Sequence, residues 1–303
     1  MTHHDHDEHR EGLEHDLPVM QGAGMVRRPM ARRGVLGLLG GIGAVGLVGC
    51  AAGSDAGSSA TSGSSAAGGV AGGSGGPGGA PGGAGGAVSQ DGLDEGDIPE
   101  ETGGPYPADG TNGVNVLTES GIVRSDITRS FGDATGVADG VPLTIDLTVY
   151  DNGADGITPY AGAAVYLWHC DRDGAYSLYS SGIEGENYLR GVQVAGDDGT
   201  LRFTSIVPAC YSGRWPHLHF EVYPSVDDAT SASGKLRTSQ IALPEDVCRT
   251  VYASAPGYDA STANLEAVSL ESDNVFSDGH SLQMGNLTGS VEDGYTLRLN
   301  VPV

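Results

Sequence analysis

The chain has 303 residues, of which 51 are glycine, 38% are hydrophobic and 6% are aromatic, and its formal net charge is -24. This acidity argues against nucleic acid as a partner, because nucleic-acid sites need clustered lysine and arginine. Much of the glycine lies before residue 105, which leaves about 200 residues for a folded core. That length is enough for one substantial domain.

The first 30 residues are rich in histidine and acidic side chains and show no apolar periodicity. A histidine-rich tract can bind metal. The composition is more typical of a disordered leader, or of a start codon assigned too far upstream. Met25 and Met30 are the alternative starts.

An export signal follows this leader. Arg32 and Arg33 precede an uncharged apolar run over residues 34–49, which indicates twin-arginine export. The run is shorter than the roughly 20 apolar residues of a membrane span, so a transmembrane anchor is the weaker alternative. Leu-Val-Gly-Cys at 47–50 resembles a bacterial lipobox and predicts a lipid on Cys50. Residues 1–49 are therefore assigned to the leader and signal.

Residues 50–104 consist mostly of Gly, Ser, Ala and Pro. Such a segment cannot bury enough apolar surface to offset its ordering entropy. A flexible chain of about 50 residues reaches roughly 40 Å. We expect a tether that holds a domain over 105–303 clear of the outer face of the cell membrane.

The residues after 142 show the period of β-strands. Apolar and polar residues alternate over 143–150, and Asp-Gly pairs indicate turns between the strand-like segments. A short helix fits within 243–253. Several short strands joined by turns predict an all-β fold, a single sandwich or barrel. The expected strands are 143–150, 164–169, 200–207, 217–223 and 295–301.

Four histidines follow the tether: His169, His217, His219 and His280. His217 and His219 lie two positions apart on an expected strand, so both imidazoles face the same side and can reach one metal ion. The alternative is a pair of surface histidines. A cupin is a weak alternative, because Glu221 follows only two residues later and only His280 lies downstream.

The neighbouring residues resemble the intradiol ring-cleavage dioxygenases. Residues 206–220 are similar to the active-site segment of that family, which carries a Tyr turn, a Gly-Arg pair and His-x-His. Residues 165–177 resemble its strand and Asp-x-x-Gly-x-Tyr turn, and residues 188–193 its Leu-Arg-Gly segment. The resemblance covers about 105–250, is greatest to the exported lipoprotein-type branch, and implies that family's β-sandwich.

The resemblance implies a non-haem ferric ion held by Tyr176, Tyr211, His217 and His219. Phenolate is a hard anionic donor that stabilises Fe(III) over Fe(II). By the same analogy, Tyr211 leaves the metal to act as base for a substrate hydroxyl, and Arg214 stabilises developing charge. The implied reaction cleaves a catechol-type aromatic diol with O2 to a cis,cis-muconate-type product. The alternatives are two ordinary turn tyrosines and a surface salt bridge at Arg214.

Further positions carry separate expectations. Tyr106 resembles a residue of the family's substrate pocket. Glu221 either orients a ligating histidine or is an exposed strand carboxylate. We expect His169 to be a hydrogen-bonded structural residue and His280 to lie in an exposed loop. Ala209 stands where the family has glycine, which puts the exact shape of the Tyr211 turn in question.

Three cysteines remain if Cys50 is lipidated: Cys170, Cys210 and Cys248. Outside the cell two of them can pair, and a Cys170–Cys210 disulfide would brace the turns that carry the tyrosines.

The rival function is a surface-displayed, non-catalytic β-sandwich binding module, against which the full ligand set and Arg214 argue. The sequence leaves the preferred catechol and the oligomeric state open, although the acidic chain slightly favours neutral catechols.

Overall fold

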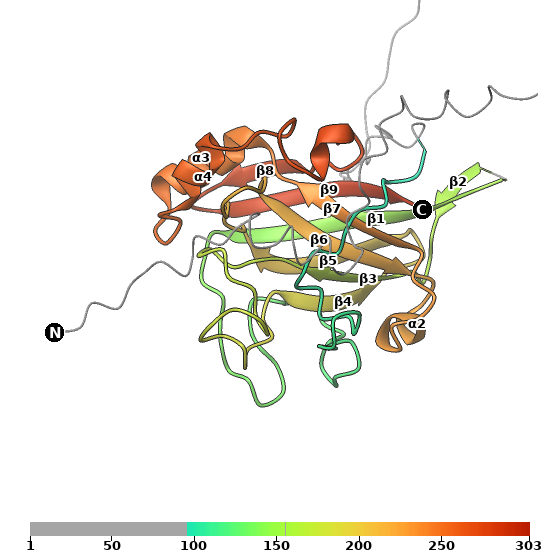
Figure 1. Ribbon diagram of the computed structural model, residues 1–303. Helices are drawn as coiled ribbons and strands as arrows, with labels where there is room; N and C mark the ends of the chain where they lie inside the picture. The colour runs from blue at the N-terminus through green and yellow to red at the C-terminus, as the bar shows by residue number, and fades with distance from the viewer. Residues whose placement is uncertain (1–95, 155) are drawn as a thin grey trace, which may run out of the picture. The chain divides into compact units, whose positions relative to one another are not determined.

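The computed structural model describes residues 96–154 and 156–303 (Figure 1). The expected leader, most of the expected tether and Cys50 with its expected lipid lie outside the described residues. Within the described ranges, no helix is long and apolar enough to cross a membrane.

A five-stranded sheet is built around β1 (Pro142–Gly153). This strand pairs in parallel with β9 (Gly294–Pro302) and antiparallel with β5 (Thr200–Ile206). The end of β1 forms a hairpin with β2 (Gly156–Pro159), and β8 (Asn286–Ser290) pairs with β9. The alternation seen in the sequence places one face of β1 in the core, through Leu143, Ile145, Leu147 and Val149.

The second sheet has four antiparallel strands in the order β4 (Arg190–Val194), β3 (Ala164–Trp168), β6 (His217–Tyr223) and β7 (Arg237–Ala242). Its register places four residues, one from each strand, in a single row across the sheet. Directly paired neighbours point to the same face, so this row presents its side chains together. The row is Arg190, Trp168, His219 and Gln240.

Strand β6 is buried along its whole length. Leu218, Phe220 and Val222 point into the core between the sheets. His217 and His219 belong to the opposite face, which loops cover. Because both faces of the strand are covered, polar side chains on it need partners inside the protein.

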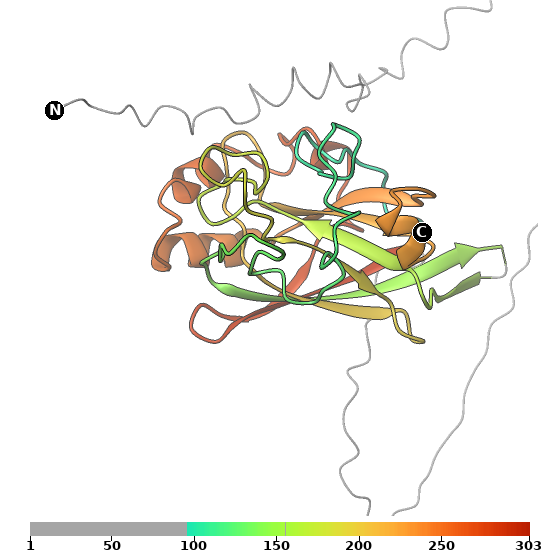
Figure 2. The same cartoon turned by 90° about the horizontal axis from the view of Figure 1, so that it is seen from below.

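The helices are short. Helices α3 (Glu245–Ser254) and α4 (Ser261–Glu266) lie at one end of the described part, and β2 lies at the other end (Figures 1 and 2). Helix α2 (Val226–Thr230) follows β6, and a 3-10 turn spans Phe276–Asp278. The expected helix is confirmed as α3, and the five expected strands and the all-β sandwich are confirmed. Strands β2, β4, β7 and β8 are additional.

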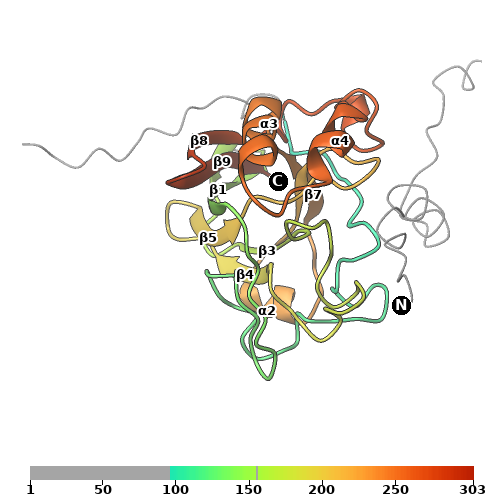
Figure 3. The same ribbon diagram turned by 90° about the vertical axis from the view of Figure 1, so that its left-hand side faces the viewer.

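The boundary expected between tether and domain, residue 105, is wrong. Ile98 is fully buried, and its N–H donates to Pro302 O at 2.8 Å. Glu101 N donates to Thr238 O at 2.7 Å, and this segment runs beside β7 (Figure 3). Residues 98–104 contain one large apolar side chain, so their composition cannot distinguish them from a linker.

The expected disulfide is also absent, because Cys170, Cys210 and Cys248 are all free and buried. The Cys170 thiol donates to Ala209 O at 3.7 Å and the Cys210 thiol to Arg214 O at 3.4 Å. Burial, with a contribution from nearby Asp273, raises the pKa of Cys210 to about 12. The thiols therefore act as buried, protonated donors to the main chain.

Candidate active site and metal centre

The two histidines of β6 point their Nε2 atoms at one another, 3.1 Å apart, and the Tyr211 hydroxyl lies 3.4 Å from His217 Nε2. His217 Nδ1 is 2.5 Å from Trp215 O. A carbonyl only accepts, so Nδ1 carries the proton and Nε2 has a free lone pair. Burial lowers the pKa of both histidines well below the usual range, with further lowering by Arg214 at His217 and by His217 at His219. Both imidazoles are therefore neutral, as metal ligands must be.

The ring of His219 is held by its neighbours in the sheet. It stacks on Trp168, with ring centroids 5.0 Å apart and planes 5° from parallel, and Trp168 stacks in turn on Tyr166. Gly104 lies close to the ring: a Cβ there would be 3.3 Å from His219 Cε1 and 3.7 Å from its Nε2, and the φ of Gly104 is +71°. The imidazole plane is thus fixed before any ligand binds.

Tyr176 is buried at the same place, with its ring 6.3 Å from that of His219 and 6.1 Å from that of Tyr211. Its hydroxyl has no hydrogen-bond partner among the described residues. Burial, then Tyr211, raises the pKa of Tyr176 well above its usual value, and Arg214 offsets only part of this rise, so the phenol is protonated unless a metal ion binds it. A buried hydroxyl without a partner is costly, which indicates a ligand at this point.

The Asp-x-x-Gly-x-Tyr turn has a clear geometric basis. Asp171 Oδ1 accepts from Asp173 N at 3.0 Å and Ala175 N at 2.9 Å, which sets the turn leading to Tyr176. Gly174 has a φ of +86°, and a Cβ there would lie 3.2 Å from Tyr211 Cβ. Only glycine allows the two tyrosine-bearing turns to approach this closely.

The main chain connects the same two turns, because Ala209 N donates to Asp171 O at 3.1 Å. Ala209 is not among the described residues with left-handed backbone. The turn that carries Tyr211 therefore does not need glycine at position 209. Alanine at this position fits the backbone without strain.

Arg190 connects the Tyr176 turn to the N-terminal segment. The guanidinium is buried and donates to Ser177 Oγ at 3.1 Å, Ser177 O at 2.9 Å, Pro107 O at 3.2 Å and Tyr166 Oη at 3.1 Å. Ser177 follows Tyr176 directly, so this side chain sets the position of the tyrosine.

Tyr106 lies in the same N-terminal segment as Pro107. Its ring centroid is 5.0 Å from that of Tyr176 and 5.1 Å from that of Tyr179. The three rings form an aromatic wall beside the candidate ligands, which is where the resemblance places a pocket residue.

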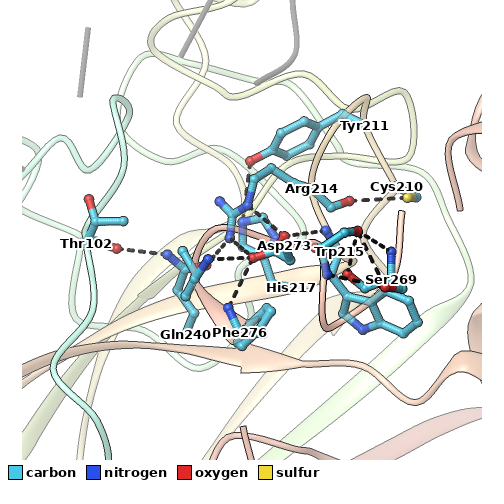
Figure 4. Close-up of polar contacts among 12 residues, drawn as sticks. Thr102, Cys210, Tyr211, Arg214, Trp215, His217, Gln240, Ser269, Asp273 and Phe276 are labelled. Atoms are coloured by element: carbon cyan, nitrogen blue, oxygen red, sulfur yellow. Dashed lines mark hydrogen bonds and ion pairs between the residues drawn. The ribbon is translucent and has the colours of Figure 1, made fainter. Parts of the chain in front are cut away.

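Arg214 is buried, so the alternative of a surface salt bridge is wrong. Its Nε donates to Asp273 Oδ2 at 3.0 Å and its Nη2 to Gln240 Oε1 at 2.6 Å (Figure 4). Burial lowers the pKa of Arg214, but Tyr211 and Asp273 outweigh it, and the pKa is raised overall. Sequence reasoning missed Asp273 and Gln240, since no local motif marks residues brought together only by the fold.

The remaining polar residues have structural partners. His169 donates from Nδ1 to Cys170 O at 2.7 Å and accepts at Nε2 from Ser205 Oγ at 2.6 Å, which confirms its structural role. His280 is half-buried rather than exposed. Both expectations for Glu221 are wrong, because its carboxylate is fully buried and accepts from Tyr223 Oη and Lys235 Nζ, both at 2.6 Å.

The candidate ligands fit a ferric ion. Among the described residues, no group of three or more His, Cys, Asp or Glu could hold a metal, and this set has only two such residues. The other two donors are the phenols of Tyr176 and Tyr211. Hard phenolate oxygens with imidazole suit Fe(III), whereas ferrous oxygenases use two His and a carboxylate. Such an ion would give a bonding partner to the Tyr176 hydroxyl, which has none among the described residues, and to the Nε2 atoms that face one another.

Comparison with known proteins finds similarity to dioxygenases. Residues 119–225, about a third of the chain, match the family model described as Dioxygenase. The chain is 41% identical over 54 residues to chlorocatechol 1,2-dioxygenase of Rhodococcus opacus, covering 18% of this chain and 21% of the relative. It is 36% identical over 88 residues to 6-chlorohydroxyquinol 1,2-dioxygenase of Cupriavidus pinatubonensis, covering 23% and 31%. The chain therefore spans a fifth to a third of these relatives.

Among solved structures, the chain is similar to an intradiol ring-cleavage dioxygenase from Tetranychus urticae. The identity is 25%, the alignment covers 61% of this chain and 87% of that one, and the TM-score is 0.48. The family model and the curated relatives confirm the resemblance to the intradiol ring-cleavage dioxygenases, and residues 119–225 form a dioxygenase-family segment.

Proposed function

We propose that this protein is an intradiol ring-cleavage dioxygenase that acts with O2 on catechol-type aromatic diols at a non-haem Fe(III) site. The proposal rests on one observation. Tyr176, whose buried hydroxyl has no hydrogen-bond partner among the described residues, lies next to Tyr211 and to the two histidines whose Nε2 atoms face one another, His217 and His219. The names of the relatives, a chlorocatechol and a chlorohydroxyquinol dioxygenase, support the substrate class.

Tyr176, Tyr211, His217 and His219 would hold the ion. Other steps need a base and a group that stabilises negative charge, and Tyr211 and Arg214 supply these. A ferric ion held by these residues would supply the electron-withdrawing centre that makes the ring of a catechol-type substrate reactive toward O2. Tyr211 is half-buried, unlike Tyr176, and is the phenol best placed to take a proton from a substrate hydroxyl at its Oη. Arg214 lies beside Tyr211 and stabilises negative charge that develops there.

The same proposal includes the location of the protein. The twin arginines, the apolar run and the lipobox support export and a lipid on Cys50, with the domain held outside the membrane by the residues that follow. A Cys50→Ser variant should move from the membrane fraction to the soluble exported fraction. Unchanged membrane association of that variant would contradict the anchor.

The activity is tested by loading the purified chain with Fe(III) and measuring O2 uptake and product absorbance with catechol, chlorocatechol, hydroxyquinol and protocatechuate. The loaded protein should be red, from phenolate-to-iron charge transfer. Tyr176→Phe and His219→Ala should lose both iron and colour. Tyr150→Phe, which changes a half-buried tyrosine of β1 in the other sheet, should keep both. A colourless, iron-free protein that leaves catechol and O2 unconsumed would instead favour the non-catalytic binding module.

A further inference from the structure

Asp273 is a fully buried carboxylate in the segment between α4 and the 3-10 turn, well beyond the dioxygenase-family segment at 119–225. It accepts from Arg214 Nε at 3.0 Å and from Trp215 N at 2.7 Å. It also accepts from Val275 N at 2.8 Å and Phe276 N at 3.2 Å. One side chain thus binds two consecutive residues of the active-site segment and the start of the 3-10 turn.

The contact with Trp215 extends to a candidate ligand. The N–H of Trp215 donates to Asp273, and the carbonyl of Trp215 accepts from His217 Nδ1 at 2.5 Å. The indole of Trp215 donates to Leu243 O at 2.9 Å, which anchors the residue from the side-chain end. Asp273 therefore helps to set the residue whose carbonyl orients the His217 ring.

The contact with Arg214 solves an electrostatic problem. A buried guanidinium is costly unless a carboxylate and further acceptors satisfy it. Asp273 binds its Nε edge, with a second, longer contact of 3.5 Å to Nη2, while Gln240 binds Nη2 at 2.6 Å. Figure 4 shows the guanidinium between these two side chains and the Tyr211 hydroxyl. Two edges of the planar group are held, so its orientation toward Tyr211 is fixed.

We propose that Asp273 is a positioning residue of the active site, which holds Arg214 in register with Tyr211 and holds the peptide that orients His217. The role rests on the proposed dioxygenase function. If so, the C-terminal part of the domain contributes a positioning residue to a site whose candidate ligands all lie within residues 176–219.

The competing role for Asp273 is a purely local one, as the acceptor for Val275 N and Phe276 N at the start of the 3-10 turn. In that case its loss would harm folding without any dependence on Arg214. A double-mutant cycle between the two residues separates the roles, because only the positioning role makes their effects interdependent.

The cycle uses full-length, iron-loaded protein with Asp273→Asn, Arg214→Met and the double variant. Asp273→Asn should lower kcat about a hundredfold, with a smaller effect on KM, as expected for a displaced group at a reacting centre. The kinetics are measured at saturating Fe(III), because loss of the support behind His217 should also weaken iron binding, by about 10–100-fold. In the Arg214→Met background, Asp273→Asn should lower kcat by much less than a hundredfold, because the guanidinium that it positions is gone. Glu271→Gln, which removes one negative charge from an exposed position of the same segment, is the matched control and should retain full kcat.

A second readout needs neither iron nor turnover. In iron-free protein labelled with 15N-arginine, the Arg214 Nε–H should exchange with solvent at least tenfold faster in Asp273→Asn than in Glu271→Gln. If Asp273→Asn is too unstable for kinetics, urea denaturation of the cycle decides. The loss caused by Asp273→Asn should shrink in the Arg214→Met background, where no buried cation is left unpaired.

Full kcat in Asp273→Asn, or equal losses of kcat or stability in both Arg214 backgrounds, would overturn the positioning role. Failure of the wild-type protein to consume O2 with any catechol would overturn the proposed function itself. The exchange of the Arg214 Nε–H would still report separately whether Asp273 holds the guanidinium.

Discussion

Arg190 is a buried cation whose hydrogen bonds all go to neutral groups, namely Ser177, Pro107 and Tyr166. Among the described residues, no salt bridge to a carboxylate involves it. Replacing it in Arg190→Met preserves much of the length and apolar volume of the side chain but removes every donor. The Tyr176 turn then loses the hydrogen bonds through which Arg190 joins it to the N-terminal segment and keeps those of Tyr179 with Ala108 N and Asn112 Oδ1, both at 2.9 Å.

The magnitude follows from what is left unpaired. Pro107 O keeps the Tyr166 hydroxyl at 2.7 Å, whereas Ser177 O loses its guanidinium donor. One buried acceptor without a donor costs about 1–3 kcal/mol, and losing the buried cation offsets part of the other lost bonds. We expect the free energy of unfolding to fall by about 2 kcal/mol and the iron affinity by about 10–100-fold, the usual effect of removing support behind a ligand.

Urea denaturation of the iron-free protein and titration with Fe(III) measure the two effects. Arg202→Met is the matched control: Arg202 is exposed and pairs with Asp146 at the surface, so its loss should cost less than about 1 kcal/mol and leave iron binding unchanged. An Arg190→Met protein with wild-type stability and wild-type iron affinity would refute the reasoning.

Three further predictions concern the N-terminal segment and the ligands. Gly104→Ala should lower the free energy of unfolding by about 1–2 kcal/mol, because the φ of this residue is +71°. The added methyl group should also displace the His219 ring and weaken iron binding. An unchanged denaturation midpoint and an unchanged charge-transfer band would contradict this prediction. Tyr176→Phe should abolish iron binding yet stabilise the iron-free protein by about 1 kcal/mol, since it removes an unpartnered buried hydroxyl. Calorimetry of the iron-free wild type and variant compares their Tm values, and a lower Tm of the variant would contradict the prediction. Burial, then Asp278, raises the pKa of Glu101 to about 7, so the folded state binds its proton more tightly than the unfolded state. Stability from this group is present below pH 4.5 and is lost as the pH rises to 7; the pH dependence of unfolding should therefore be flatter in Glu101→Gln, and identical curves would exclude the effect.

Local patterns predicted the parts of the site that depend on short-range geometry. The two-residue spacing of His217 and His219 places them on one face of a strand wherever that strand pairs. The turn from Asp171 to Tyr176 depends on its own side-chain-to-main-chain bonds and on a glycine. These features persist in any fold that contains the segment, so a resemblance over a short run could identify them.

Burial, by contrast, was misjudged wherever it depends on what covers a surface. Glu221 continues the face of the two histidines, and from the sequence it could be an exposed strand carboxylate. The structure buries it and provides Lys235 and Tyr223 as partners. Residues 98–104 look like a linker because only Ile98 is apolar, yet their main chain is bound to β7 and β9.

The sequence by itself determined the all-β class, the strand that carries both histidines and the tyrosine-bearing turns, because each depends on side-chain period or on bonds within a few residues. Only the tertiary structure decided that Gln240 and Arg190 lie in one row with His219, and that Asp273 reaches Arg214 from 59 positions away. The physical reason is that strand register and loop path are set by the packing of the whole core. No local pattern encodes which distant carboxylate will meet a buried guanidinium.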